Sequence, residues 1–226
     1  MAAPPYPKLT MPGVPFLLPI EFDLAAASLM AVTGVWAAGR RGYDLVGAAM
    51  LAFVTGVGGG LLRDGIFLQV VPVVMQDSAF LWAILAALVI GALTQRLAER
   101  FEKLIAYIDA LAIGVYSVYG ANKALIAGIT PEAAIIVGIC NAVGGGLIRD
   151  VLVREEPLVF KPGQLYVVAA LAGCIPFVVM TYYYEVSSDH AAWIAISVTM
   201  LLRVLSIRFN WTTKPVSNWD IGRPRD

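Results

Sequence analysis

A ten-residue block containing three adjacent glycines and an Arg-Asp pair occurs twice in this chain. Residues Thr55–Asp64 read TGVGGGLLRD and residues Asn141–Asp150 read NAVGGGLIRD, so seven of the ten positions are identical at a shift of 86 residues. Glycine weakens a helix interior, and a charged side chain inside an apolar segment is costly. Two such blocks predict a protein built from two copies of one unit, with its function where the blocks meet.

The composition of the chain indicates a membrane protein. Of its 226 residues, 59% are hydrophobic and 14% are charged, and the mean hydropathy is +0.78. A membrane-spanning helix needs about 20 mostly apolar residues. Seven such segments are predicted, at Asp23–Gly39, Asp44–Val70, Ser78–Gln95, Ile105–Leu125, Pro131–Val153, Gln164–Tyr184 and Ala191–Phe209. We therefore expect an all-α integral membrane protein with one transmembrane domain over residues 1–226.

The repeat extends beyond the glycine blocks. The same shift pairs Asp23 with Asp109, and Pro72 pairs with Pro157 after a slip of one residue. Because each unit contains three spans, an odd number, the second unit enters the membrane from the opposite face, which makes an inverted 3+3 repeat plus one helix. The predicted parts are repeat 1 at about 22–97, repeat 2 at about 107–185, a seventh helix at about 190–209 and a flexible tail at 210–226.

The basic residues are distributed unevenly between the two predicted faces. Thirteen of the 16 Lys and Arg residues fall on the side of the loop that follows the first span, and three fall on the other side. Cytoplasmic loops of membrane proteins carry the excess of positive charge. We expect a cytoplasmic C-terminus and an external N-terminus, in a plasma or inner membrane.

The two glycine triplets admit two interpretations. They are Gly58, Gly59 and Gly60 in the second span and Gly144, Gly145 and Gly146 in the fifth. In the first interpretation the helices break or kink there, and freed carbonyls line a polar path together with Thr55 and Asn141, whose oxygens suit a permeating ion. In the second the glycines only allow close helix packing. Packing alone does not require three glycines followed by charges, so we favour the path.

The charged residues at membrane depth are expected to pair. They are Asp23, Arg63, Asp64, Asp109, Arg149 and Asp150. A central charge costs about 2.5–3.5 kcal/mol on insertion scales, and such residues face the bundle interior or water. The topology predicts two symmetry-related ion pairs, Asp23–Arg63 and Asp109–Arg149. The alternative is that these side chains extend to the lipid headgroups.

Lys123 breaks the symmetry, because its counterpart in the repeat is Ala37. It lies late in the fourth predicted span, near Tyr116, Tyr119 and Asn122. A basic group there is suited to bias ion passage, to bind a lipid phosphate or to respond to voltage. One charge gains only about 2.3 kcal/mol per 100 mV, so a voltage response would be shallow. The alternative is that its amine extends to the outer interface.

Neither catalysis nor a metal site is expected. His190 is the only histidine, and Cys140 and Cys174 both fall within predicted spans. Buried free thiols behave as small apolar residues. The contiguous Ser188, Asp189 and His190 have the composition of a turn and not the geometry of a catalytic triad.

Two Gly-Gly-Gly-x-x-Arg-Asp motifs on the second and fifth spans of a three-plus-three-plus-one layout resemble the prokaryotic trimeric intracellular cation (TRIC) channel family. They also resemble a related bacterial family with the same three-helix repeat, often described as glycine transporters. The first resemblance implies a homotrimer in which each subunit has its own pore, lined by spans two and five and kinked at the triplets. It also implies passage of monovalent cations, with potassium preferred over sodium.

The same resemblance implies roles for individual residues. By matched position the glycine triplets are the kinks, and Arg63, Asp64, Arg149 and Asp150 are the charges beside the pore. Lys123 matches a basic residue that the family links to gating or lipid binding. The expected ligands are permeant K+ or Na+ and membrane lipids, with no cofactor and no nucleic acid.

Two other functions remain open. A secondary transporter of a small solute such as glycine would use the same inverted repeat for alternating access. A membrane scaffold or lipid-binding protein would use the glycines for packing only.

Overall fold

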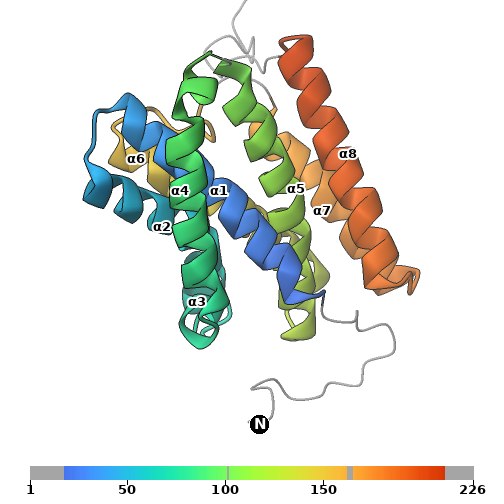
Figure 1. Ribbon diagram of the computed structural model, residues 1–226. Coiled ribbons are helices and arrows are strands. Elements are labelled where there is room, and N and C mark those ends of the chain that lie inside the picture. The colour runs from blue at the N-terminus through green and yellow to red at the C-terminus, as the bar shows by residue number, and fades with distance from the viewer. Residues whose placement is uncertain (1–17, 101, 162–164, 212–226) are drawn as a thin grey trace, which may run out of the picture.

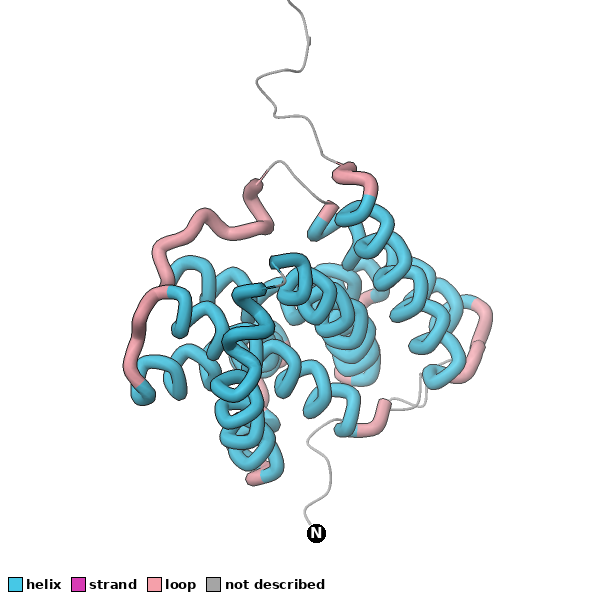
Figure 2. Tube along the Cα trace, turned by 45° about the horizontal axis from the view of Figure 1, so that its top comes forward, coloured by secondary structure: helices cyan, strands magenta, loops and turns pink. Residues whose placement is uncertain are grey.

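A computed structural model describes residues 18–100, 102–161 and 165–211, and every regular element in these ranges is helical (Figures 1 and 2). The start of the sixth predicted span at Gln164 and most of the predicted flexible tail lie outside these residues. The elements are α1 Ile20–Arg40, α2 Leu45–Leu61, the π-helical turn η1 Leu62–Phe67, α3 Val73–Gln76, α4 Ala79–Arg100, α5 Glu102–Ile126, α6 Pro131–Leu152, α7 Tyr166–Val178, the π-helical turn η2 Val179–Tyr183 and α8 Ser188–Arg208.

The protein is a multi-pass membrane protein. Six helical segments in the described part are long and apolar enough to cross a membrane: α1, α2 with η1, α4, α6, α7 with η2, and α8. Helix α5, which we expected as the fourth span, has 25 residues but is not among these six. It lies inside the bundle against α1, α6, α7 and α8 (Figure 1). A count of seven spans remains a prediction.

The two halves use the same local signals at matched positions. Helices α1 and α5 are each followed by a glycine with positive φ, +69° at Gly42 and +80° at Gly128, a backbone conformation that glycine adopts without strain. The N-terminus of the next helix, α2 or α6, is stabilised differently in the two halves. The Asp44 carboxylate accepts a hydrogen bond of 2.8 Å from the Gly47 amide, and Pro131 occupies the first turn of α6.

Helices α2 and α6 cross at their glycine triplets in direct backbone contact. A β-carbon on Gly59 would overlap the carbonyl oxygen of Asn141, and one on Gly145 would overlap that of Thr55. The crossing is antiparallel, because the later residue of each helix faces the earlier residue of the other. The shift of 86 residues converts Gly59 into Gly145 and Thr55 into Asn141, so the two contacts are equivalent in the repeat. The two halves of the chain therefore meet about a pseudo-two-fold axis at the triplets.

The expected break in the helices at the triplets is wrong. Both triplets lie within continuous α-helix, and the helix irregularity in the first half begins only at Leu62. The absence of side chains at these glycines lets the two backbones touch, which is the close-packing interpretation. A bend of α2 and α6 at the triplets, with the helical hydrogen bonds kept, stays a prediction.

The turn η1 explains the one-residue slip in the repeat. Eight positions separate Asp64 from Pro72, whereas seven separate Asp150 from Pro157. A π-helical turn holds one more residue than an α-helical turn, so η1 takes up the difference. The residue that leaves the helix is in the left-handed region in both halves, with φ of +52° at Gln69 and +56° at Arg154.

The third helices of the two repeats are placed differently. Helix α4 packs mainly on α1, whereas α7 packs on α5, α6 and α8 (Figure 1). Helix α8, which belongs to neither repeat, covers α5 and α7. The second repeat is thus covered by an additional helix on a side where the first repeat has none within the described residues.

Candidate functional site

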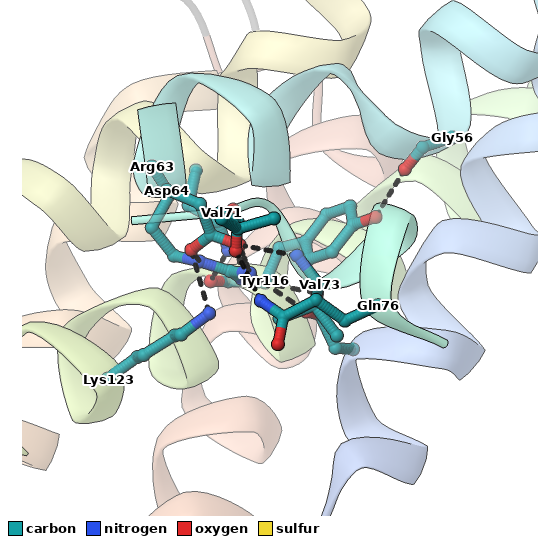
Figure 3. Close-up of polar contacts among 10 residues, drawn as sticks. Gly56, Arg63, Asp64, Val71, Val73, Gln76, Tyr116 and Lys123 are labelled. Atoms are coloured by element: carbon teal, nitrogen blue, oxygen red, sulfur yellow. Dashed lines mark hydrogen bonds and ion pairs between the residues drawn. The ribbon is translucent and has the colours of Figure 1, made fainter. Parts of the chain in front are cut away.

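A buried group of four charged residues lies where η1 meets the start of α1 and the end of α5. We call Asp23, Arg63, Asp64 and Lys123 the first cluster. Arg63 donates from both terminal nitrogens to the Asp23 carboxylate, at 3.2 and 3.0 Å, and from Nε to Asp64 Oδ1 at 2.7 Å. Lys123 Nζ donates to the same Asp64 oxygen at 2.8 Å (Figure 3). Two acidic and two basic groups make this cluster neutral.

Polar and aromatic groups complete the surroundings of the first cluster. The Tyr119 ring lies with its centre 5.1 Å from the guanidinium carbon of Arg63, a cation–π contact. Asn141 accepts from Arg63 Nη1 at 3.4 Å and donates to the Tyr116 carbonyl at 2.7 Å. The Tyr116 hydroxyl donates to the Gly56 carbonyl (Figure 3). The first cluster is therefore tied directly to the crossing of α2 and α6.

The second cluster consists of Asp109, Arg149 and Asp150 together with Thr33. Arg149 donates from Nε to Asp150 Oδ1 at 3.0 Å and from Nη1 to the Thr33 hydroxyl at 2.8 Å. Its contact with Asp109 Oδ1 is long, at 3.5 Å. These groups are buried as well. The second cluster lies near the end of α6 and the start of α5, at the opposite end of the crossing from the first.

Each cluster is closed by the same backbone contact. The amide of Val73 donates to Asp64 Oδ2 at 3.1 Å, and the amide of Leu158 donates to Asp150 Oδ2 at 3.2 Å. Each of these residues follows the proline that the repeat matches with a slip of one. The segment after η1 and the segment after α6 thus each donate a backbone amide to the aspartate of an Arg-Asp motif.

Both predicted ion pairs, Asp23–Arg63 and Asp109–Arg149, are confirmed as contacts. The alternative that these charges extend to the headgroups is wrong, since the Arg63 side chain is 1% exposed and Arg149 is also buried. It is wrong for Lys123 too, which is 6% exposed and turned toward Asp64. The roles of these residues in permeation remain predictions.

Thr55 and Asn141 are both buried in the crossing, but they make different contacts. Asn141 uses its side-chain oxygen and nitrogen as described above, whereas the Thr55 hydroxyl oxygen has no hydrogen-bond partner among the described residues. Their carbonyl oxygens lie against Gly59 and Gly145. Neither side chain therefore faces open space in this conformation.

The space beside the first cluster is small. A cavity of about 10 Å³, lined in part by Asp23, Gly60, Asp64 and Tyr116, has room for about one water molecule. An apolar groove of about 450 Å³ between α1, α4 and α5 is lined by none of the cluster residues. The crossing is thus closed in this conformation, with a charged cluster on either side.

Sequence reasoning missed two of the groups that hold the arginines. Thr33 accepts from Arg149, and Tyr119 stacks on Arg63. These two residues are themselves separated by 86 positions. Pairing every residue with its partner 86 positions away would have shown that Thr33 and Tyr119 occupy the same position relative to an Arg-Asp motif. Their side chains differ in chemistry, so sequence identity alone does not reveal the match.

The sequence profile of one protein family matches this chain twice, over residues 21–96 and 106–182, once in each half. That family is described as glycine transporter. The chain belongs to the glycine transporter family. Two relatives of this chain are named as membrane proteins. The inner membrane protein YadS of Escherichia coli is 32% identical and the alignment covers 83% of this chain and 91% of that one. A membrane protein of Deinococcus radiodurans is 37% identical, with 67% and 71% covered.

Solved structures connect this fold to cation channels. The trimeric intracellular cation channel orthologue from Rhodobacter sphaeroides superposes with a TM-score of 0.79, at 28% identity, over 84% of this chain and 97% of that one. The resemblance to both families is therefore confirmed. Two further solved structures that share the fold are also TRIC channels, with TM-scores of 0.75 and 0.73.

Proposed function

We propose that this protein is a monovalent cation channel, permeable to potassium, with one pathway inside each subunit of a homotrimer. The observation that carries the proposal is the glycine crossing of two inverted helices, with a buried Arg-Asp cluster at each end. The likeness to trimeric cation channels supports both the ion pathway and the trimer. In the same proposal all seven long helices, α5 included, span the membrane.

The pathway opens when α2 and α6 separate at their triplets. Because glycine has no side chain, a small separation or a bend exposes backbone carbonyl oxygens of Gly58–Gly60 and Gly144–Gly146 to water and cations. At the first cluster, opening frees Asp64 from Lys123 and leaves its carboxylate to attract a cation. At the second cluster, the carboxylates of Asp109 and Asp150 likewise attract a cation when the pathway opens.

The proposed orientation places the C-terminus in the cytoplasm and the N-terminus outside, in a bacterial plasma membrane. The ends of α1, α4 and α8 carry Arg40, Arg96, Arg100 and Arg208, and Arg41 pairs with Glu155 at 3.0 Å in the loop after α6. This gathering of positive charge on one face agrees with the rule for cytoplasmic loops. Lipids are proposed as further partners at this face, and no cofactor is proposed.

A vesicle flux assay tests the proposal. Purified protein in potassium-loaded vesicles should release K+ down its gradient, as followed by a potential-sensitive dye, and an Asp64→Asn variant should release it about tenfold more slowly, because Arg63 and Lys123 then leave a net positive cluster. The matched control is Asp189→Asn in the exposed first turn of α8, which should match the wild type. Equal K+ release from protein-free vesicles would contradict the proposal.

Glycine transport is a second candidate, favoured by the family description and by the closed crossing. Alternating access requires a barrier between two half-sites, and the two clusters on either side of a sealed crossing fit that requirement. The same vesicles distinguish the two functions. Saturable uptake of labelled glycine without passive K+ release indicates a transporter, and the absence of both indicates a scaffold.

A further inference from the structure

The second cluster lacks the additional cation that the first cluster has. In each half the repeat supplies two carboxylates and one guanidinium: Asp109, Asp150 and Arg149 in the second cluster, with a net charge of −1. The first cluster has the same deficit and is neutralised by Lys123. The counterpart of Lys123 is Ala37, which has no charge. Because an uncompensated buried charge is costly, a cation from another part of the chain is needed.

Helix α8 provides a buried guanidinium at this place. The side chain of Arg203 is 1% exposed, and its guanidinium carbon lies 5.1 Å from the centre of the Tyr166 ring. Tyr166 also lies close to the second cluster, because a β-carbon on Gly146 would be 2.9 Å from its hydroxyl oxygen and 3.7 Å from Nη2 of Arg149. Arg203 thus belongs to the electrostatic surroundings of the second cluster.

The aromatic ring under Arg203 occupies a matched position in the repeat. Tyr166 corresponds to Phe80 at the shift of 86 residues, and Phe80 lines the small cavity of the first cluster. Tyr166 also approaches the glycine crossing, since a β-carbon on Gly146 would lie 2.9 Å from its hydroxyl oxygen. Each end of the crossing therefore has an aromatic residue from the repeat and a cation from outside the motif.

The position of Arg203 is set by close helix packing. A β-carbon on Gly173 of α7 would overlap the hydroxyl of Thr199, which lies one helical turn before Arg203. At the other end of α8, Asn122 donates to the Ser188 hydroxyl at 3.5 Å. Helix α8 is thus fixed at two points along its length, and Arg203 is held beside Tyr166 by rigid elements.

We propose that Arg203 is the counter-charge of the second cluster and the functional counterpart of Lys123 at the opposite end of the pathway. One cation from outside the Arg-Asp motifs then controls access at each end of the crossing. The electrostatic part of this inference stands on the contacts above, and its consequence for currents rests on the proposed channel function. Since a fixed positive charge slows the approach of cations from its own side, the two residues act on currents of opposite direction.

Current–voltage curves test the consequence for conduction. In excised patches from giant spheroplasts, where all molecules share one orientation, Arg203→Gln should change the ratio of inward to outward current about two- to threefold. Lys123→Gln should change it by a similar factor in the opposite sense. Arg203→Lys, which keeps the charge, and Arg208→Gln, at an exposed position of the same helix, should leave the ratio unchanged. A change in the same sense for both, or none for Arg203→Gln, would overturn the proposal.

A thermal cycle tests the electrostatic part without any current. Arg203→Gln should lower the unfolding midpoint of the purified protein on the order of 5 °C, because it leaves the second cluster negatively charged. Adding Asp109→Asn should recover at least half of that loss, whereas Asp23→Asn in the first cluster should recover none. If the loss in the double variant equals the sum of the losses from Arg203→Gln and Asp109→Asn alone, Arg203 is not the counter-charge. Wild-type patches without current would contradict the channel proposal and leave this cycle to decide the role of Arg203.

Discussion

The two Arg-Asp motifs have the same sequence but hold their partner carboxylates differently. In the first cluster both oxygens of Asp23 accept from Arg63, at 3.2 and 3.0 Å. In the second cluster Asp109 receives one long contact of 3.5 Å from Arg149, and its other oxygen has no hydrogen-bond partner among the described residues. Identical motifs in an inverted repeat therefore produce one tight ion pair and one loose ion pair.

The neighbours of each arginine explain the difference. Thr33 offers a hydroxyl oxygen that accepts from Arg149 at 2.8 Å and draws its Nη1 away from Asp109. At the matched position Tyr119 presents a ring face, which attracts the cation without accepting a directional hydrogen bond. Arg63 is then free to form a bidentate pair with Asp23. We therefore infer that the difference between Thr33 and Tyr119 loosens the second ion pair.

The largest expected effect comes from the one feature that the two halves share without difference, the glycine crossing. Leucine at Gly59 or at Gly145 should abolish the folded protein, because even a β-carbon overlaps a carbonyl oxygen of the facing helix. The yield of monodisperse protein in detergent measures this. The control is Gly65→Leu, at an exposed site of η1 where a β-carbon meets no atom within 4 Å. Normal yields for both crossing variants would show that the backbones are not in contact.

A smaller difference is expected between the two arginines. Arg63→Gln should destabilise the protein by about 3–5 kcal/mol, since it leaves Asp23 buried without its bidentate partner. Arg149→Gln should cost about 1–2 kcal/mol less, because its pair with Asp109 is already long. Reversible unfolding in mixed micelles measures both values. Equal losses would contradict the difference between the tight and the loose pair.

The aromatic neighbour of the first cluster should contribute less than the arginine that it contacts. Tyr119→Leu removes the ring over Arg63 and should cost about 2 kcal/mol, the upper range for a desolvated cation–π contact. Unfolding of the purified variant measures the loss. Tyr107→Leu, at a partly exposed site of the same helix, serves as the control. A loss of stability no greater than that of the control would show that the Tyr119 ring does not stabilise the first cluster.

The smallest expected effect is also the sharpest test of the comparison. Thr33→Val should cost only about 1 kcal/mol, because Arg149 can then turn toward Asp109 and recover part of the lost hydrogen bond. The coupling between Arg149 and Asp109, measured by a double-mutant cycle, should rise in the Thr33→Val background. An unchanged coupling would show that Thr33 does not loosen this pair.

Much of this architecture could be predicted from the repeat. The shift of 86 residues located both ion pairs, because residues that share a register in two inverted units must meet matching partners. It also located the slip at Pro72 and Pro157, although not its cause. The π-helical turn at Leu62–Phe67 has no evident sequence signal, since it depends on how one additional residue is accommodated before a fixed loop contact.

Other features could not be predicted from the sequence. Arg203 lies in α8, outside the repeat, so no register linked it to Asp109. Lys123 was placed at a span end where extension to the interface and inward pairing are equally compatible with the sequence. Only the packing of α5 within the bundle directs its amine to Asp64. The continuity of both helices through the triplets likewise depends on the facing backbone, which the composition of one segment does not reveal.

Single-channel recording under bi-ionic conditions, with K+ on one side of a planar bilayer and Na+ on the other, tests the central claim most directly. The account predicts discrete current steps whose reversal potential lies on the side that indicates preference for K+. It also predicts that Asp64→Asn reduces the size of these steps while Asp189→Asn does not. A silent bilayer, with saturable glycine uptake by the same preparation, would contradict the claim that the glycine crossing opens as an ion pathway.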